Sequence, residues 1–329
     1  MNTLKDHPGM QGTAIAQPNI ALIKYWGKRD IERNLPAVGS ISITLRELFT
    51  RMHVEFDQSL PADTLVVNGA ADDKMLPRLA ACLDRVAGAD RPRARIASTC
   101  NFPIAAGLAS SASAFAAVTV AAAKAAGSVL DVDTLATLAG RASGSAARSL
   151  FGGFVELQNV DDDIRCRTIA QAEDWPLSVV VAITEKGPKA VGSTEAMEIS
   201  RQTSPFYSSW VEQQAHDLAT ARTAIAARDF EKLAAIAEHN CLKMHSIMWA
   251  SRPPMVYWNA ATMRCLQTVR QLQGQGIGVF FTIDAGPQVK AVCLPEYVDN
   301  VEAALRATAG VTEIMTTGLG GGARLEDGS

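Results

Sequence analysis

The stretch from Phe102 to Val118, FPIAAGLASSASAFAAV, constrains the fold of this chain more than any other. A proline and a glycine-bearing turn of small residues lead directly into an alanine-rich run with high helix propensity. The first backbone N–H groups of a helix have no partner inside it, and small residues let an anion approach them closely. The pattern therefore predicts a phosphate-binding loop at a helix start. An ordinary serine N-cap on a buried helix is the alternative that the stretch alone leaves open.

The loop differs from the two best-known nucleotide-binding motifs. The sequence has neither G-x-x-x-x-G-K-[ST] nor G-x-G-x-x-G at this point. Its order of a proline, a small-residue turn, G-L-x-S-S and a helix instead resembles the phosphate-binding loop of the GHMP kinases, a superfamily of small-molecule kinases. The resemblance implies that ATP is bound through five residues of the loop: Gly107, Ala109, Ser110, Ser111 and Ser113.

The composition is that of an ordinary globular protein. The 329 residues are 48% hydrophobic and 20% charged, with a formal net charge of −3, which suits one or two domains with a full core. No basic block stands out, so nucleic acid is not an expected partner. Six cysteines are scattered without a C-x-x-C pair, which indicates free thiols in a reducing compartment. Because no apolar signal core or membrane-spanning run occurs, we expect a cytoplasmic protein without a membrane partner.

The hydrophobic pattern predicts an α+β protein. Residues 40–48, SISITLREL, alternate at first as a half-buried strand does. Residues 177–183 are continuously apolar and predict a strand buried on both faces. Strands mixed with runs of helix, without regular βα alternation, favour α+β over a doubly wound sheet.

A domain boundary is expected near residues 184–188, where the chain becomes charged and carries glycine and proline. The predicted division is a flexible tail, an N-terminal domain and a C-terminal domain, over residues 1–13, 14–185 and 186–329. The last residues, 318–329, are rich in glycine, and we expect them to be frayed.

Four charged residues are candidates for chemistry, and each also has an ordinary explanation. Lys24 and Lys28 flank an aromatic pair, where surface lysines often lie with their stems on apolar side chains. Asp284 occupies a D-A-G-P turn, in which aspartates commonly bond their own backbone. Arg148 lies in S-G-S-A-A-R-S and is either a surface helix residue or a planar clamp for a carboxylate. Taken singly, none of these residues assigns a function.

The joint pattern is more specific than any of its parts. Four runs occur in this order across the chain: NIALIKYWGKRD, FPIAAGLASSASAFAA, SGSAARSLFGGFVEL and FFTIDAGP. Together they resemble the mevalonate diphosphate decarboxylase family of the GHMP kinase superfamily over residues 14–315. The resemblance implies an N-terminal domain with the ribosomal protein S5 domain 2-like fold, a ferredoxin-like C-terminal domain, an active-site cleft between them and a homodimer.

The resemblance also implies a reaction. Members of the family use ATP to phosphorylate the tertiary 3-hydroxyl of mevalonate 5-diphosphate, after which phosphate and carbon dioxide leave. The product is the alkene isopentenyl diphosphate of isoprenoid biosynthesis. Magnesium is the implied cofactor beside ATP, held mainly by phosphate oxygens and water without a dedicated protein site, with Ser111 as the candidate side chain.

Residue roles follow from the positions that match the family motifs. Asp284 matches the essential carboxylate beside the 3-hydroxyl, and Lys24 matches the lysine at the transferring phosphoryl group. Arg148 matches the clamp for the carboxylate and hydroxyl of the substrate. Further substrate contacts are implied at Tyr25, Lys28, Ser143, Ser145 and Ser193.

One departure from the family pattern concerns Ala37, Val38 and Gly39, where members carry a polar stretch close to the ligands. Relatives that decarboxylate mevalonate 5-phosphate, or that act as mevalonate 3-kinases, share the fold. The combination of Lys24, Arg148 and Asp284 favours a decarboxylase over a 3-kinase. The sequence leaves the number of phosphates on the substrate open.

Overall fold

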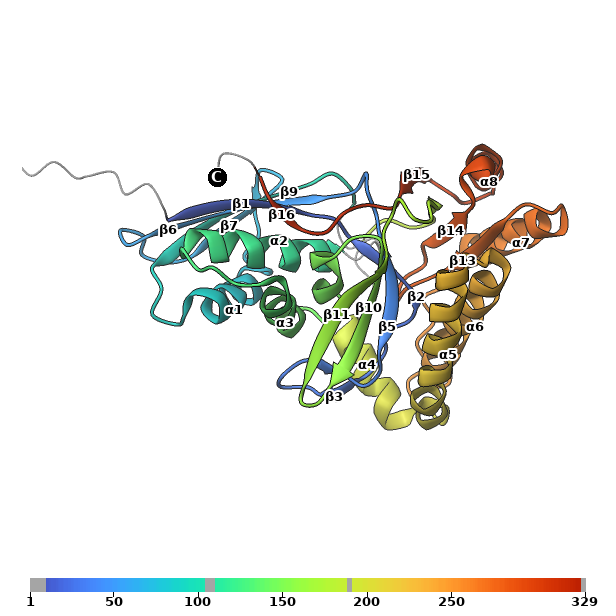
Figure 1. The fold of residues 1–329 in the computed structure, drawn as a ribbon, viewed down its shortest axis with the longest axis horizontal. Helices are drawn as coiled ribbons and strands as arrows, with labels where there is room; N and C mark the ends of the chain where they lie inside the picture. Colours follow the sequence, from blue (N-terminus) through green and yellow to red (C-terminus); the bar gives the residue numbers. More distant parts are fainter. Residues whose placement is uncertain (1–9, 104–109, 188–190, 327–329) are drawn as a thin grey trace, which may run out of the picture.

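The computed structural model describes residues 10–103, 110–187 and 191–326, which form two lobes joined through the middle of the molecule (Figure 1). Most of the expected tail, with Gly107 and Ala109, lies outside these residues. The predicted domain division at residue 185 stays a prediction. No described helix is long and apolar enough to span a bilayer.

A six-stranded sheet with helices on one face forms the N-terminal lobe. In spatial order its strands are β16 (Arg324–Leu325), β1 (Gln11–Ala16), β6 (Thr50–Asp57), β9 (Arg93–Cys100), β7 (Thr64–Val67) and β8 (Ala70–Ala71). Its helices are α1 (Leu76–Ala87), α2 (Ser110–Ala125) and α3 (Val132–Ala142). Buried and half-buried residues alternate along β6, because one face of an antiparallel sheet packs while the other meets water. The nearly all-apolar α2 fills the space between this sheet and the other helices.

A second, four-stranded sheet lies between the lobes, in the order β11 (Asp163–Ala170), β10 (Phe154–Val160), β5 (Ser40–Thr44) and β2 (Asn19–Ile23). The half-buried strand expected in residues 40–48 is wrong, since all of β5 is buried. Its serines face Arg148 instead of solvent and accept hydrogen bonds from the guanidinium. Short elements nearby are β3 (Lys28–Asp30), β4 (Leu35–Pro36) and the 3-10 helix η1 (Ala146–Leu150).

The C-terminal lobe is built on an antiparallel four-stranded sheet, β13 (Val279–Thr282), β14 (Val289–Cys293), β12 (Ser178–Ile183) and β15 (Glu313–Gly318) in spatial order. Its helices are α4 (Ser193–Thr203), α5 (Tyr207–Ala227), α6 (Phe230–Trp249), α7 (Ala260–Gly274), the 3-10 helix η2 (Pro295–Tyr297) and α8 (Val298–Arg306). The strand predicted from the apolar run 177–183 is β12. Val179 and Val181 pack on the side of β2 and α5, while Val180 and Ala182 pack with α7 and α8. Burial on both faces explains the continuous apolar run.

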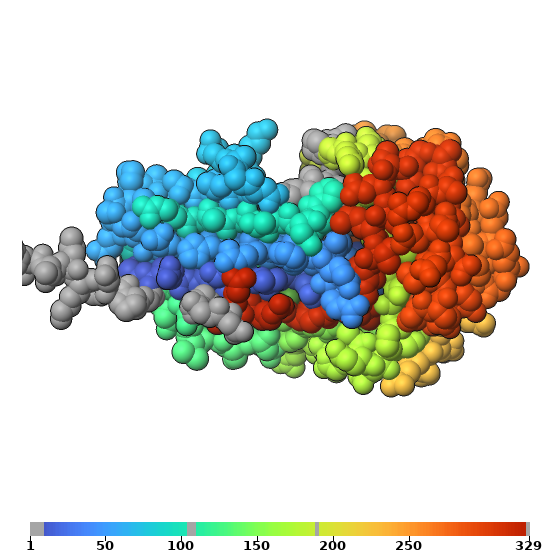
Figure 2. All heavy atoms as spheres, turned by 90° about the horizontal axis from the view of Figure 1, so that it is seen from above, coloured from blue at the N-terminus to red at the C-terminus, as the bar shows by residue number. Residues whose placement is uncertain are grey.

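The two ends of the described chain meet in the N-terminal sheet. Strand β1 begins at Gln11, inside the segment expected to be a tail, and pairs with β16. The fraying expected for residues 318–329 is therefore wrong as far as Leu325. Figure 2 shows this segment, in red, leaving the C-terminal lobe and lying along the blue strands. Glycine lets the C-terminal segment lie directly against the backbone of Arg46, because a side chain at Gly320 would overlap that backbone.

Candidate active site

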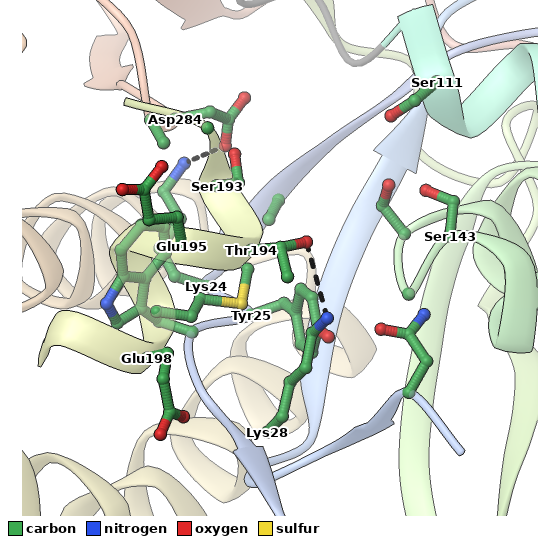
Figure 3. Close-up of a pocket in the computed structure, with 18 of the residues that line it drawn as sticks. Lys24, Tyr25, Lys28, Ser111, Ser143, Ser193, Thr194, Glu195, Glu198 and Asp284 are labelled. Atoms are coloured by element: carbon green, nitrogen blue, oxygen red, sulfur yellow. Dashed lines mark hydrogen bonds and ion pairs between the residues drawn. The ribbon is translucent and has the colours of Figure 1, made fainter. Parts of the chain in front are cut away.

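A cavity of about 830 Å³ opens between the two lobes and gathers residues from distant parts of the chain. Its walls come from the segment after β2, the starts of α2 and α4, the η1 region and the turn after β13. Figure 3 shows how these side chains face one another. The charged lining residues are Lys24, Lys28, Arg78, Arg148, Glu195, Glu198 and Asp284. Four cations against three carboxylates indicate a site for anionic ligands.

Lys24 and Asp284 meet at one end of the cavity, where Lys24 Nζ lies 2.7 Å from Asp284 Oδ1 (Figure 3). Helix α6 positions both residues. Asn240 accepts a hydrogen bond from the backbone N–H of Lys24 at 2.7 Å. The backbone of Ile283, next to Asp284, contacts Cys241 Sγ at 3.2 Å and His245 Nε2 at 3.2 Å. The buried face of α6 therefore fixes the backbone on both sides of the pair.

The electrostatics around Asp284 favour its ionised form. A second ammonium, Lys290 Nζ on β14, lies 3.3 Å from Asp284 Oδ2. Burial would raise the pKa of Asp284, but the charges of Lys24 and Lys290 outweigh it and hold that pKa well below its usual range. The carboxylate is thus an anion at every ordinary working pH. An ionised carboxylate in this position can accept a hydrogen bond from a ligand and supplies a fixed negative charge.

Arg148 lies in a polar cradle with only 2% of its surface exposed. Its Nε donates to Asn19 Oδ1 at 3.2 Å and to Ser42 Oγ at 3.1 Å, and its Nη1 donates to Ser40 Oγ at 2.6 Å. No described residue accepts from Nη2, and Arg148 lines the cavity. These hydrogen bonds fix the plane of the guanidinium through Nε and Nη1. Its Nη2 group remains available to donate to a ligand.

Tyr25 contributes a hydroxyl to the same cavity. Burial raises the pKa of this phenol, so the hydroxyl stays protonated, and it finds no hydrogen-bond partner among the described residues. The Tyr25 ring lies close to the backbone of Gly144, since a side chain at that glycine would overlap the ring. Burying a hydroxyl without a hydrogen-bond partner costs free energy, so a ligand that accepts a hydrogen bond from Tyr25 would be favoured here.

The comparisons with known proteins agree with this geometry. Residues 16–168 match the family model of the diphosphomevalonate decarboxylase-like N-terminal domain, and residues 179–322 match that of the mevalonate 5-diphosphate decarboxylase C-terminal domain. The diphosphomevalonate decarboxylase of Candida albicans is 35% identical over 84% of this chain and 83% of its own length. The chain belongs to the diphosphomevalonate decarboxylase family. The resemblance drawn from the four sequence runs is thereby confirmed.

Two further comparisons bear on fold and substrate. The phosphomevalonate decarboxylase of Haloferax volcanii is 33% identical over 97% of this chain and 99% of its own length. A solved structure, MDDEF in complex with MVAPP, AMPPCP and magnesium, is similar with a TM-score of 0.89 at 33% identity, covering 96% of this chain and 98% of that one. The α+β, two-domain GHMP-type fold expected from sequence is confirmed by this similarity, and the chain is an enzyme of this family.

The structure brings most of the predicted site residues of this family member together. The residues from the sequence prediction that line the cavity are Lys24, Tyr25, Lys28, Ser111, Ser143, Ser145, Arg148, Ser193 and Asp284. Ser110 begins α2 beside them. Ser113 does not line the cavity, because it is fully buried and its Oγ lies 2.7 Å from Thr50 Oγ1. Its hydroxyl ties α2 to β6.

The departure at Ala37, Val38 and Gly39 lies away from the cavity. None of these residues is among those that line it within the described chain. Val38 packs with Trp26 and Trp210 behind the site, and a side chain at Gly39 would overlap Leu157 O. The missing polar side chains of this segment therefore take no group away from the described lining of the cavity, since the segment packs behind its wall.

Sequence reasoning missed several lining residues, of which Arg78 is the most informative. Arg78 extends from α1, in a segment whose pattern indicates only an amphipathic surface helix. Burial, and then the nearby Arg78, lower the pKa of Lys28. Two cations that repel each other at the edge of one cavity indicate a place for a multiply charged anion. No local motif marks Arg78, because its position depends on how α1 packs.

Proposed function

We propose that this protein catalyses the ATP-dependent decarboxylation of mevalonate 5-diphosphate to isopentenyl diphosphate. The observation that carries the proposal is the doubly paired Asp284 carboxylate, which shares one cavity with Lys24 and the cradled Arg148. The Candida albicans relative, named diphosphomevalonate decarboxylase, supports the same reaction. In the first step, the 3-hydroxyl reacts with ATP to give a 3-phosphate, ADP and a proton. The 3-phosphate then releases phosphate and carbon dioxide and leaves the alkene.

Asp284 orients the 3-hydroxyl in this proposal. Its carboxylate accepts a hydrogen bond from the hydroxyl and turns the oxygen toward the phosphoryl group. When phosphate leaves, positive character develops at C3, and the fixed negative charge of Asp284 stabilises it. The low pKa of Asp284 suits this role, because a carboxylate that stayed protonated would offer no charge.

Lys24 and Arg148 each face one of the two anionic groups close to C3, the transferring phosphoryl group and the substrate carboxylate. Lys24 Nζ, beside Asp284, stabilises the charge on the transferring phosphoryl group. Arg148 binds the substrate carboxylate through the donors that its cradle leaves available. Ser143 and Ser145 line the wall beside Arg148 and add hydroxyl contacts to the same end.

ATP binds at the start of α2 in this proposal. Backbone N–H groups at a helix start favour phosphate, and Ser110 and Ser111 add hydroxyl donors there. Gly107 and Ala109 belong to the same loop by sequence. Magnesium supplies charge neutralisation between the phosphates when it is bound, and Ser111 is the candidate protein contact. Among the described residues, no group of three or more acidic, histidine or cysteine side chains is placed to hold a metal ion.

The diphosphate of the substrate lies at the edge formed by Lys28 and Arg78. Tyr25 donates its hydroxyl, and the start of α4, with Ser193, adds helix N–H groups on the facing wall. Two cations at this edge favour two phosphates over one. The second candidate is decarboxylation of mevalonate 5-phosphate, which the Haloferax volcanii relative favours, and a mevalonate 3-kinase is the remaining alternative of this fold.

The deciding experiment offers mevalonate, its 5-phosphate and its 5-diphosphate separately to the purified protein with ATP and Mg²⁺. ADP and carbon dioxide are trapped and counted together. Equal amounts of both from the 5-diphosphate alone are expected. Preference for the 5-phosphate would select the second candidate, and ADP without carbon dioxide would identify a 3-kinase.

Arg78→Gln is expected to raise KM for the 5-diphosphate by about tenfold to a hundredfold, the value of one charge-assisted hydrogen bond. KM for the 5-phosphate should change much less, because the distal phosphate is absent. Steady-state kinetics on both substrates measure the difference. Arg85→Gln, an exposed arginine on the same helix, is the matched control. An equal rise in KM for both substrates would show that Arg78 does not contact the second phosphate.

The proposal includes a cytoplasmic homodimer without nucleic-acid or membrane partners. Exposed apolar side chains gather on α6 and in the connection to α7, including Trp249 and Val256. Such groups are common at subunit interfaces. Light scattering is expected to give twice the 35.0 kDa of the chain, and Trp249→Glu should shift the mass toward one chain. A single-chain mass for the unaltered protein at every concentration would contradict the dimer.

A further inference from the structure

Lys290 is a fully buried lysine to which the reaction above gives no role. It lies on β14, opposite Thr282 of β13 and Val181 of β12, and 1% of its side chain is exposed. Lysine is almost never buried to this extent unless it is paired, because taking an ammonium out of water is costly. A buried charge beside a reactive carboxylate is a candidate for a functional role.

The two lysines hold the carboxylate from different sides. Lys24 Nζ contacts Asp284 Oδ1 at 2.7 Å, and Lys290 Nζ contacts Asp284 Oδ2 at 3.3 Å. Lys24 and Asp284 line the cavity, whereas Lys290 is not among the described lining residues. Both side chains are 1% exposed, but Lys24 belongs to the cavity wall, whereas Lys290 reaches the carboxylate from the protein side.

This arrangement matters when a phosphoryl group arrives. The negative charge of the phosphoryl group attracts the ammonium of Lys24. That ammonium then neutralises less of the negative charge on Asp284. Burial alone favours the neutral carboxylic acid. A second cation beyond the reach of ligands would keep the carboxylate ionised at the moment when its charge is needed.

We propose that Lys290 is a positioning residue that holds Asp284 ionised and in place while Lys24 is engaged by the phosphoryl group. The inference rests on the proposed function and deepens it. It gives Lys290 no contact with substrate or ATP, and it makes the lysine act only through Asp284.

Other groups that face Asp284 do not replace this charge. On α6, burial lowers the pKa of His245 to about 3 and raises the pKa of the Cys241 thiol, so both are neutral. Arg148 of η1 is held in its own cradle, and Glu195 of α4 adds negative charge to the cavity wall. Within the described residues, Lys24 and Lys290 are the cations in ion-pair contact with Asp284.

The test is the pH dependence of Lys290→Met, with Lys290→Gln as a second variant that keeps a hydrogen-bond donor without charge. Removing one cation raises the pKa of Asp284 by about 1–3 units. The active carboxylate form is lost as pH falls through that pKa, so activity should fail toward acid. The ratio of variant to wild-type kcat between pH 8 and 4.5 reports the ionisation of Asp284 in the complex in which Lys24 is engaged, and it cancels the ionisation of the substrate. We expect this ratio to be flat near neutrality and to fall toward pH 4.5.

A double-variant cycle adds a second readout. Because Lys290 acts only through Asp284, Lys290→Met should lower kcat of the wild type but leave that of Asp284→Asn unchanged. Carbon-13 NMR of carboxyl-labelled aspartate, in folded wild type and Lys290→Met, reports the Asp284 pKa directly and needs no turnover. Lys232→Met, an exposed lysine on α6, is the matched control.

A pH-independent ratio, an unshifted Asp284 titration, or an equal loss of kcat in the Asp284→Asn background would each overturn the inference. Failure of the proposed function looks different, because the wild type itself would then release no carbon dioxide from any phosphorylated mevalonate. In that case the NMR titration still decides whether Lys290 sets the ionisation of Asp284.

Discussion

Asp284→Asn is expected to lower kcat by about 10²- to 10⁴-fold, the range that a positioned acid–base or orienting group contributes. Asparagine has nearly the same shape, so the cavity keeps its walls. It carries no negative charge to face the positive character at C3, and its amide accepts a weaker hydrogen bond from the 3-hydroxyl. The affinity for ATP should not fall together with kcat. Lys24 and Lys290 lose their anion, so the affinity for ATP should be unchanged or higher.

The measurements separate catalysis from folding and binding. kcat is followed by ADP and carbon dioxide release, and Kd for ATP and substrate by calorimetry. The two unpaired ammoniums should also lower the stability by up to about 3–5 kcal/mol, so thermal denaturation must show a folded variant at the assay temperature. Asp299→Asn, an exposed aspartate on α8, is the matched control. Near-normal kcat, or a loss explained wholly by weaker substrate binding, would remove Asp284 from the chemistry.

The presence of Lys24, Arg148 and Asp284 in one site could be predicted from the sequence because they lie in short runs that together resemble the motifs of the family. Lys24 precedes an aromatic pair and Gly27, whose φ of 99° and contact with Tyr207 exclude other residues. Arg148 follows small residues that let η1 pack tightly. Asp284 lies in a strand-ending turn. Each run is short enough to be seen in the sequence, but only the order of the four runs along the chain made the pattern specific.

The rest depends on packing between segments far apart in the chain. Arg78 and Lys290 lie in an ordinary helix and strand pattern, and only the fold brings them to the cavity and to Asp284. Contacts between distant segments also explain why the predictions for β5 and for the glycine-rich C-terminal residues were wrong. Alternation in β5 was compatible with a solvent-facing side, but Arg148 takes the place of solvent. The terminal glycines suggested fraying, but a side chain at Gly322 would overlap the backbone at Leu150.

The second large effect is expected for Arg148→Lys. In the wild type, Nε and Nη1 are held by Asn19, Ser40 and Ser42, which fixes the plane of the guanidinium. A lysine has one ammonium and no fork, so it cannot satisfy the cradle and bind a carboxylate through two parallel donors. Truncating one partner of a buried charged pair typically costs about 2–5 kcal/mol, so kcat/KM for the full substrate should fall by about 30-fold or more.

A substrate analogue without the carboxylate tells what Arg148 binds. If the guanidinium clamps that carboxylate, 3-hydroxy-3-methylbutyl diphosphate should bind to wild type and Arg148→Lys with similar Kd, whereas mevalonate 5-diphosphate should bind the variant more weakly. The difference between the two ligands isolates the contact from any change in the cradle, because the cradle is the same in both measurements. Arg306→Lys, in an exposed ion pair on α8, is the matched control and should change neither value. An equal loss for both ligands would mean that Arg148 shapes the wall of the cavity and does not bind the carboxylate.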